Sequence, residues 1–208
     1  MRNEDQKKCV CGANETCLCE SEMENDCCGE DKGVGMLQVG QPAPGFSAEA
    51  VVDGGTFVEV CSGNYIGKWL VLFFYPLDFT FVCPTEIIGF SKRLGEFKAL
   101  NAEVLGGSTD SVHSHKAWLK ELGDLHFPLF SDITREMSDD YNVLIPKKGV
   151  ALRGTFIIDP DGILRYAVTH DLNVGRSVSE TLRVLQALQT GELCQIEWSN
   201  GSQTLGKS

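Results

Sequence analysis

The chain has 208 residues, of which 42% are hydrophobic and 23% are charged, proportions that suit one globular domain with extra segments. Its formal net charge of −11 argues against nucleic acid and anionic membranes as partners, because both would repel it. No apolar run approaches the roughly 20 residues that span a bilayer, and residues 1–20 lack the apolar stretch of a secretory signal. We therefore expect a cytoplasmic protein whose cysteines stay reduced, bind metal or cycle during catalysis.

Residues 1–36 form an acidic, cysteine-rich extension. They hold nine acidic and four basic residues and few large apolar side chains, so burial cannot offset the entropy of ordering them. Thiolates suit Zn²⁺ or Cu(I), although Cys-x-Cys is tighter than the usual zinc spacing. Three interpretations stay open: a flexible thiol-rich tail, a metal-ordered segment, and redox exchange with the other cysteines. The six cysteines concerned are Cys9, Cys11, Cys17, Cys19, Cys27 and Cys28.

The first half of residues 37–190 alternates between strand and helix patterns. "SAEAVVDGGTFVEV" predicts a hairpin that turns at Asp53-Gly54-Gly55, and "KWLVLFFYP" predicts a strand buried on both faces that ends at Pro76. "TEIIGFSKRLGEFKAL" has helical spacing of its apolar residues. A short strand ("AEVLGGSTD"), a helix capped by Ser111, an extended piece ("FPLFSD") and a short helix ("ITREMSDDYNV") follow.

The second half predicts a hairpin and a closing helix. "GTFIIDPDGILRYAVTH" has two apolar arms around a Pro-Asp-Gly turn. In "SVSETLRVLQALQ", Ser177 and Glu180 stand in capping-box relation ahead of an apolar stripe. Together the elements predict an α/β fold with a central mixed β-sheet flanked by helices on both faces. Residues 191–208 follow as a C-terminal arm.

The stretch "FFYPLDFTFVCPTE" places Cys83 between the buried strand and a helix. The helix begins either at Cys83, with Pro84 in the favoured first position, or near Asp78, with Pro84 kinking its first turns. Either way the sulfur lies near unpaired backbone N–H groups and the positive end of the helix dipole, which favour the nucleophilic thiolate. The competing interpretation is a cysteine that only packs, because free cysteines are among the most buried residues.

The same stretch resembles the active-site segment of the peroxiredoxins, where Pro-x-x-x-Thr-x-x-Cys carries the peroxidatic cysteine. "LRGTFIIDPDGILR", "NVGRSVSETLR" and "GELC" extend the resemblance over about residues 37–200, and it is strongest to the typical two-cysteine branch. The resemblance implies a thioredoxin-like fold and a homodimer or a ring of dimers. It also implies that Cys83 is the peroxidatic nucleophile and that Cys194 resolves its sulfenic acid as a disulfide.

The resemblance assigns roles to further residues around Cys83. Thr80 matches the threonine that holds the peroxide, and Pro76 matches the proline that shields the pocket from water. Arg153 matches the arginine that faces the cysteine, and Glu86 the carboxylate that positions this arginine. Arg176 is a candidate second arginine of the same network. Each residue also has an ordinary interpretation, such as a helix cap, a strand end or a solvated strand edge.

The implied function is a thiol-specific peroxidase that reduces hydrogen peroxide and alkyl hydroperoxides without a cofactor. A thioredoxin-like dithiol protein or a flavoprotein reductase would then reduce the disulfide. One alternative is a metal- or thiol-sensing protein that acts through the N-terminal cysteines, and another is a holdase chaperone. Cys61 and the histidines match no role and are interpreted as packing or surface residues: His113, His115, His126 and His170.

Overall fold

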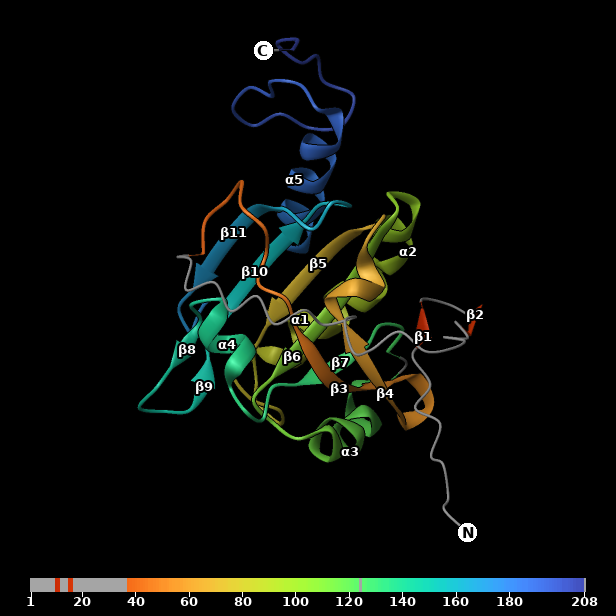
Figure 1. Ribbon diagram of the computed structural model, residues 1–208, viewed down its shortest axis with the longest axis vertical. Helices are drawn as coiled ribbons and strands as arrows, with labels where there is room; N and C mark the ends of the chain where they lie inside the picture. Colours follow the sequence, from red (N-terminus) through yellow and green to blue (C-terminus); the bar gives the residue numbers. More distant parts are fainter. Residues whose placement is uncertain (1–9, 12–14, 17–36, 124, 208) are drawn as a thin grey trace, which may run out of the picture.

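The computed structural model describes residues 10–11, 15–16, 37–123 and 125–207 (Figure 1). Near the N-terminus, β1 (Val10–Cys11) and β2 (Glu15–Thr16) pair in antiparallel fashion. Cys9, Cys17, Cys19, Cys27 and Cys28 lie outside the described residues, so the three interpretations of the extension stay open. Within the described part of the chain, no group of three or more His, Cys, Asp or Glu side chains could hold a metal ion.

A seven-stranded mixed sheet forms the centre of the fold, in the order β11-β10-β5-β6-β7-β3-β4. β5, β6 and β7 run parallel, whereas the neighbouring pairs at both ends of the sheet are antiparallel. The two predicted hairpins supply these antiparallel ends, which confirms the mixed sheet. The strands are β3 (Ser47–Val52), β4 (Thr56–Cys61), β5 (Trp69–Phe74), β6 (Ala102–Ser108), β7 (Leu129–Ser131), β10 (Arg153–Ile158) and β11 (Leu164–His170).

A smaller hairpin of β8 (Leu144–Ile145) and β9 (Val150–Ala151) pairs separately from the sheet. The sequence did not predict it, because two-residue strands are too short to show an alternating pattern. Two short 3-10 turns, η1 (Asp53–Gly55) and η2 (Ser62–Tyr65), flank β4. At η1, Gly54 adopts a φ of 74°, which is the conformation that the predicted glycine turn requires.

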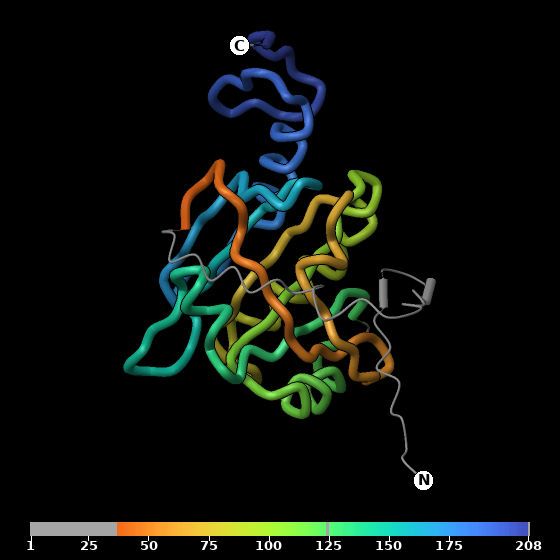
Figure 2. Tube along the Cα trace, in the orientation of Figure 1, coloured from red at the N-terminus to blue at the C-terminus, as the bar shows by residue number. Residues whose placement is uncertain are grey.

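Helices cover both faces of the sheet (Figures 1 and 2). One hydrophobic cluster joins the sheet to α1, α2, α3 and α5, and a second, on the opposite face, includes Met137 of α4. β5 contributes Val71 and Phe73 to the first cluster and Leu72 and Phe74 to the second, which confirms a strand buried on both faces. The helices are α1 (Cys83–Lys92), α2 (Leu94–Ala99), α3 (Val112–Leu122), α4 (Glu136–Asp140) and α5 (Val178–Thr190).

The helix ends agree with the predictions from the sequence, with two exceptions. Ser111 caps α3 and Ser177 caps α5, each by accepting the N–H three residues ahead. The capping box at α5 is half formed, because the carboxylate of Glu180 binds Arg183 instead of reaching back. The stretch predicted as one helical segment is divided into α1 and α2 at Arg93, whose φ of −107° and ψ of 10° leave the helical region.

The C-terminal arm is tied back on itself beyond α5 and extends away from the sheet (Figure 2). The N–H of Leu193 donates to Gly206, and the N–H of Leu205 donates to Leu193. Trp198 is buried, its indole donates to Ser202, and its carbonyl accepts from Arg183 on α5. These contacts give the residues around Cys194 a defined position although they have no helical or strand periodicity.

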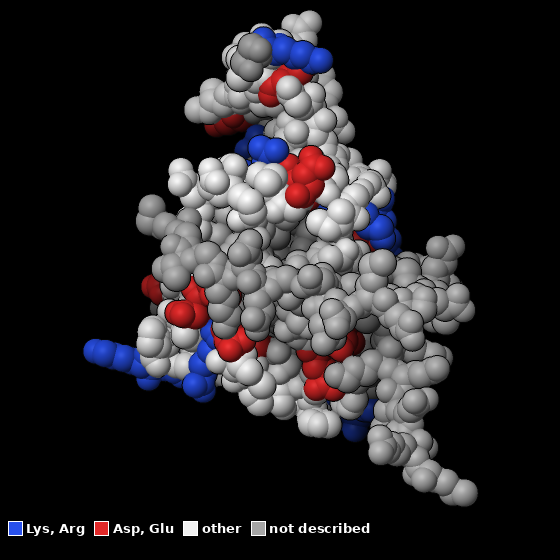
Figure 3. All heavy atoms as spheres, viewed as in Figure 1, with Lys and Arg blue, Asp and Glu red and all other residues white. Residues whose placement is uncertain are grey.

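The described surface agrees with the charge of the sequence. On the face drawn in Figure 3, acidic and basic side chains are interspersed and do not gather into one basic surface. Among the described helices, none is long and apolar enough to cross a membrane.

Phe73 should contribute strongly to stability. It is fully buried, stacks on Phe90 with 4.6 Å between ring centroids, and meets Phe127 edge-on at 5.7 Å. We expect Phe73→Ala to lower the free energy of unfolding by about 3–5 kcal/mol, because it leaves a cavity in the larger cluster. Urea denaturation followed by circular dichroism measures this change. Phe81→Ala is the matched control, because Phe81 is 96% exposed, and equal losses in both variants would contradict the assignment of the core.

Candidate active site

Cys83 is the first residue of α1, so the helix begins at the cysteine and not near Asp78. Pro84 lies in the first turn, where a missing backbone N–H costs no hydrogen bond. The sulfur therefore lies at the helix N-terminus, among backbone groups that carry partial positive charge. Cys83 is fully buried and belongs to the same hydrophobic cluster as Phe73.

Arg153 joins Cys83 to Glu86. It is the first residue of β10, and its Nη1 donates to Cys83 Sγ at 3.3 Å and to Glu86 Oε2 at 2.6 Å. Its Nε donates to the carbonyl of Leu172 at 2.9 Å, which fixes the plane of the guanidinium. An always-charged guanidinium at this distance stabilises negative charge on the sulfur. The structure thus brings together the cysteine, arginine and glutamate that the sequence singled out.

Arg176 binds the other side of the Glu86 carboxylate. Its backbone N–H and its Nε each donate to Glu86 Oε1 at 2.9 Å. Its remaining nitrogens donate to the carbonyls of Phe74 at 2.6 Å and Gly154 at 2.8 Å, and the guanidinium lies 5.0 Å from the ring centroid of Phe73. Arg176 therefore belongs to the network, as its motif predicted.

The buried charges of this network do not cancel. Burial raises the pKa of Glu86, but hydrogen bonds and charge from Arg176, with a smaller effect of Arg153, outweigh it and hold the pKa below its ordinary value. Glu86 is thus a carboxylate between two guanidinium cations. The network therefore holds one more positive than negative charge, and the guanidinium that contacts Cys83 belongs to it.

Pro76 and Thr80 lie on the loop that joins β5 to α1. Pro76 is buried directly beyond β5, and Thr80 is half-buried. The hydroxyl of Thr80 donates to the carbonyl of Leu77 at 3.0 Å, which closes a turn three residues before Cys83. This bond leaves the hydroxyl oxygen with acceptor capacity. The roles in peroxide binding and water exclusion stay predictions for both residues.

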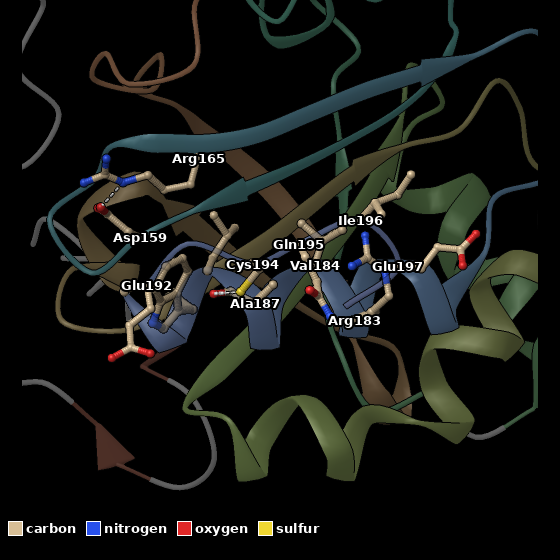
Figure 4. A pocket seen from close by; sticks show the side chains of 13 residues that line it. Asp159, Arg165, Arg183, Val184, Ala187, Glu192, Cys194, Gln195, Ile196 and Glu197 are labelled. Atoms are coloured by element: carbon tan, nitrogen blue, oxygen red, sulfur yellow. Dashed lines mark hydrogen bonds and ion pairs between the residues drawn. The ribbon is translucent and has the colours of Figure 1, made fainter. Parts of the chain in front are cut away.

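Cys194 lies far from Cys83 and the arginines. It lines a cavity of about 800 Å³ between α5, the C-terminal arm and the turn that joins β10 to β11 (Figure 4). Its sulfur is 3.8 Å from the carbonyl of Ala187 and 3.5 Å from the hydroxyl of Thr190. The cavity also reaches Trp69, the first residue of β5, whereas Arg153 and Cys83 lie beyond the last residue of that strand. Six residues of strand separate the two sites, which is roughly 17 Å.

Comparison with known proteins identifies the family. Residues 39–167 match the AhpC/TSA family. The chain is 55% identical to peroxiredoxin-2 of Bos taurus over 177 residues, which cover 80% of this chain and 88% of that protein. It is 53% identical over 176 residues to the mitochondrial thioredoxin-dependent peroxide reductase of Drosophila melanogaster, covering 80% of this chain and 75% of that protein. The chain belongs to the peroxiredoxin family.

A solved structure supports the same assignment. The reduced 2-Cys peroxiredoxin of Plasmodium vivax matches with a TM-score of 0.79 and 43% sequence identity, over 81% of this chain and 93% of that one. The thioredoxin-like fold is therefore confirmed. This peroxiredoxin is a 2-Cys-type peroxidase, an oxidoreductase that acts on peroxide. The comparisons do not support the alternative of a metal- or thiol-sensing protein.

Several contacts of the peroxiredoxin site could not be predicted from its sequence. The carbonyls of Leu172, Phe74 and Gly154 orient the two arginines, and every residue type offers such a carbonyl. Cys61 is buried, and its N–H and thiol both donate to Asn64 Oδ1, in agreement with a packing role.

Removing the charge of Glu86 should destabilise the folded chain. Glu86→Gln leaves two buried guanidinium groups without their counter-charge, so we expect the free energy of unfolding near pH 7 to fall by about 3–5 kcal/mol. The pKa of Glu86 is lowered in the folded state, so the ionised carboxylate stabilises the fold fully at a pH above its ordinary pKa of 4.5. This stabilisation is lost as the pH falls through the lower pKa of the folded state. Urea unfolding across this pH range measures the effect.

The difference between Glu86→Gln and wild type should therefore shrink as the solution is acidified below pH 4.5. Glu103→Gln is the matched control, because Glu103 pairs with Lys68 on a partly exposed surface and its loss should change stability little. A pH-independent difference for Glu86→Gln would contradict the ionised state assigned to this carboxylate.

Proposed function

We propose that Cys83 is the peroxidatic nucleophile of this peroxiredoxin, acting as a thiolate on hydrogen peroxide and alkyl hydroperoxides. The observation that carries the proposal is the 3.3 Å contact between Arg153 Nη1 and Cys83 Sγ at the N-terminus of α1. The surplus positive charge of the buried network supports the same ionisation state. A buried cysteine that only packs has no need of a guanidinium.

The reaction follows from a thiolate held in this position. The sulfur attacks one oxygen of the hydroperoxide, so an S–O bond forms while the O–O bond breaks. Cys83 becomes a sulfenic acid, and the departing hydroxide or alkoxide takes up a proton to leave as water or alcohol. Negative charge moves from sulfur to the departing oxygen, so fixed donors that face this oxygen stabilise the transition state.

Three side chains are suited to control this step. Arg153 carries N–H groups that can pass from the sulfur to a peroxide oxygen. The hydroxyl of Thr80 both donates and accepts, so it can orient the terminal O–H of the peroxide. Pro76 is buried beside the site and adds apolar surface that keeps water away from the thiolate.

Cys194 is proposed as the resolving cysteine. Its sulfur attacks the sulfenic sulfur, an S–S bond forms, and the hydroxyl leaves as water. A disulfide requires Cα atoms within about 7 Å, whereas the two cysteines of one chain lie at opposite ends of β5. The bond therefore joins Cys83 of one subunit to Cys194 of another in a homodimer, or in a ring of such dimers. Because Cys83 is fully buried, the first turn of α1 must open during this step.

A dithiol protein is proposed to complete the cycle. The similarity to a thioredoxin-dependent peroxide reductase favours a thioredoxin-like partner, and a flavoprotein reductase is the other candidate. Reduction of the disulfide by exchange needs no cofactor on this chain. A cytoplasmic location would supply such a low-potential dithiol.

The first reaction with peroxide should depend on Cys83, and continued turnover should depend on Cys83 and Cys194 but not on Cys61 or the N-terminal cysteines. We expect Cys83→Ser to reduce peroxide consumption to the uncatalysed rate. Cys194→Ser should complete one turnover and accumulate a sulfenic acid at Cys83, trapped with dimedone and located by mass spectrometry. Cys61→Ser is the matched control and should turn over normally, as should a chain that lacks residues 1–36. Continued turnover by Cys83→Ser would disprove the proposed nucleophile.

The disulfide should join two subunits. We expect peroxide-treated wild type to run as a covalent dimer on a non-reducing gel, and each cysteine variant alone to run as a monomer. Mixing Cys83→Ser with Cys194→Ser should restore dimers with one disulfide, because each subunit then supplies the cysteine that the other lacks. A monomeric disulfide in oxidised wild type would show instead that the chain rearranges to close the bond internally.

A further inference from the structure

The side chain of Asp78 is buried on the loop between β5 and α1, outside the Arg153 network. Its carboxylate lies within hydrogen-bond distance of three groups: Tyr75 Oη at 2.9 Å, Ser114 Oγ at 2.7 Å and His115 Nδ1 at 2.9 Å. The N–H of Asp78 also donates to Asp110 Oδ2 at 2.8 Å. The residue is 6% exposed. Both its side chain and its backbone are therefore fixed.

The groups that hold Asp78 are held in turn by the sheet. Nε2 of His115 faces the carbonyl of Phe130 on β7 at 2.9 Å, so both ring nitrogens face acceptors. The carboxylate of Asp110 accepts from Ser108 at the end of β6 at 2.8 Å. Burial, followed by the charge of Asp78, raises the pKa of Tyr75 well above its ordinary value, so its phenol stays protonated and donates.

The turn that follows Asp78 contains strained backbone. Phe79 adopts a φ of 53°, in the left-handed region that large side chains avoid. The hydroxyl of Thr80 closes this turn onto the carbonyl of Leu77 at 3.0 Å. Such a conformation is unfavourable and persists only where the surrounding structure determines it. The anchored Asp78, immediately before Phe79, restrains this turn, as does the contact of the Phe79 ring with Trp118 on α3, at 5.8 Å between centroids.

We propose that Asp78 is a positioning residue for peroxide reduction, because its buried contacts to Tyr75, Ser114 and His115 hold the turn that places Thr80 relative to Cys83. The proposal rests on the roles proposed above for Cys83 and Thr80. Asp78 itself does not touch the sulfur or Arg153. Its effect on the reaction passes through the loop, which must present the threonine hydroxyl to the peroxide in the correct geometry.

A positioning role predicts that a substitution at Asp78 slows the reaction of Cys83 with peroxide but not the alkylation of Cys83, whereas a purely structural role predicts the same change in both. Loosening the turn should misplace Thr80, and a displacement of about 1 Å at a reacting group can cost about a hundredfold in rate. It should leave the thiolate intact, because Arg153, Glu86 and the start of α1 make no contact with Asp78 among the described interactions. Reaction of Cys83 with peroxide and alkylation of Cys83 should therefore respond differently to the same substitution.

The experiment measures both reactions on pre-reduced full-length protein. One measurement is the single-turnover loss of hydrogen peroxide, and the other is the rate of iodoacetamide labelling at Cys83, followed by mass spectrometry. We expect Asp78→Asn to slow the peroxide reaction about tenfold to a hundredfold while labelling is unchanged. Ser114→Ala, which removes one partly buried donor, should show the same pattern to a smaller degree and serves if Asp78→Asn does not fold.

Asp132→Asn is the matched control. Asp132 is also a buried aspartate, bound to Ser138 and to the N–H of Met137 at the start of α4, and its loss should leave both rates unchanged in the folded protein. Wild-type peroxide rates in Asp78→Asn and Ser114→Ala, or parallel losses in both reactions, would overturn the positioning role. Cys83→Ser is run alongside: peroxide loss in that variant would instead overturn the proposed nucleophile.

Discussion

One carboxylate shared by two guanidinium groups organises this peroxiredoxin site. Glu86 binds Arg153 on one side and Arg176 on the other, and all three side chains are buried. Taking three charges out of water is costly, so nearly every N–H of the two guanidinium groups needs an acceptor. Backbone carbonyls of β5, β10 and the segment after β11 accept from the N–H groups that Glu86 does not bind. The arrangement leaves one positive charge beside the first turn of α1. A sulfur placed there is stabilised as an anion by the same contacts that hold the sheet and the helices together.

The separation of the two cysteines has a consequence for the reaction cycle. Cys83 lies beyond the end of β5 with no exposed surface, and Cys194 lines an open cavity next to its start. Six residues of strand separate the two sulfurs of one chain, and for this reason the proposed cycle joins cysteines of two subunits and requires α1 to open at its first turn. In the proposed cycle, the burial of Cys83 makes the resolving step depend on a conformational change.

The loop between β5 and α1 carries the residues that lead to Cys83. It begins with a buried proline, contains a residue in the left-handed region, and ends at the nucleophile. Asp78 ties it to α3 directly, and to β6 and β7 through Asp110 and His115. The site is therefore supported from two sides: Arg153 places a guanidinium 3.3 Å from the sulfur, and the proposed role of Asp78 is to hold the loop that carries Thr80.

Much of this protein could be read from local patterns. The apolar run of β5, the two hairpins and a helix after β5 were predictable because strand alternation, turn glycines and helical spacing act over a few residues, whereas only the structure decided that this helix starts at Cys83 and not near Asp78. The short hairpin of β8 and β9, the break at Arg93 and the cluster around Asp78 were not, and the grouping of Glu86 with Arg153 and Arg176 was expected only from the family resemblance. Arg176 and Glu86 are 90 residues apart, and Asp78 and His115 are 37 apart, so only the folded sheet brings them into contact. Local sequence determined which elements form, whereas tertiary packing decided which charges share one buried space, because the energy of a buried charge depends on neighbours that the chain supplies from distant positions.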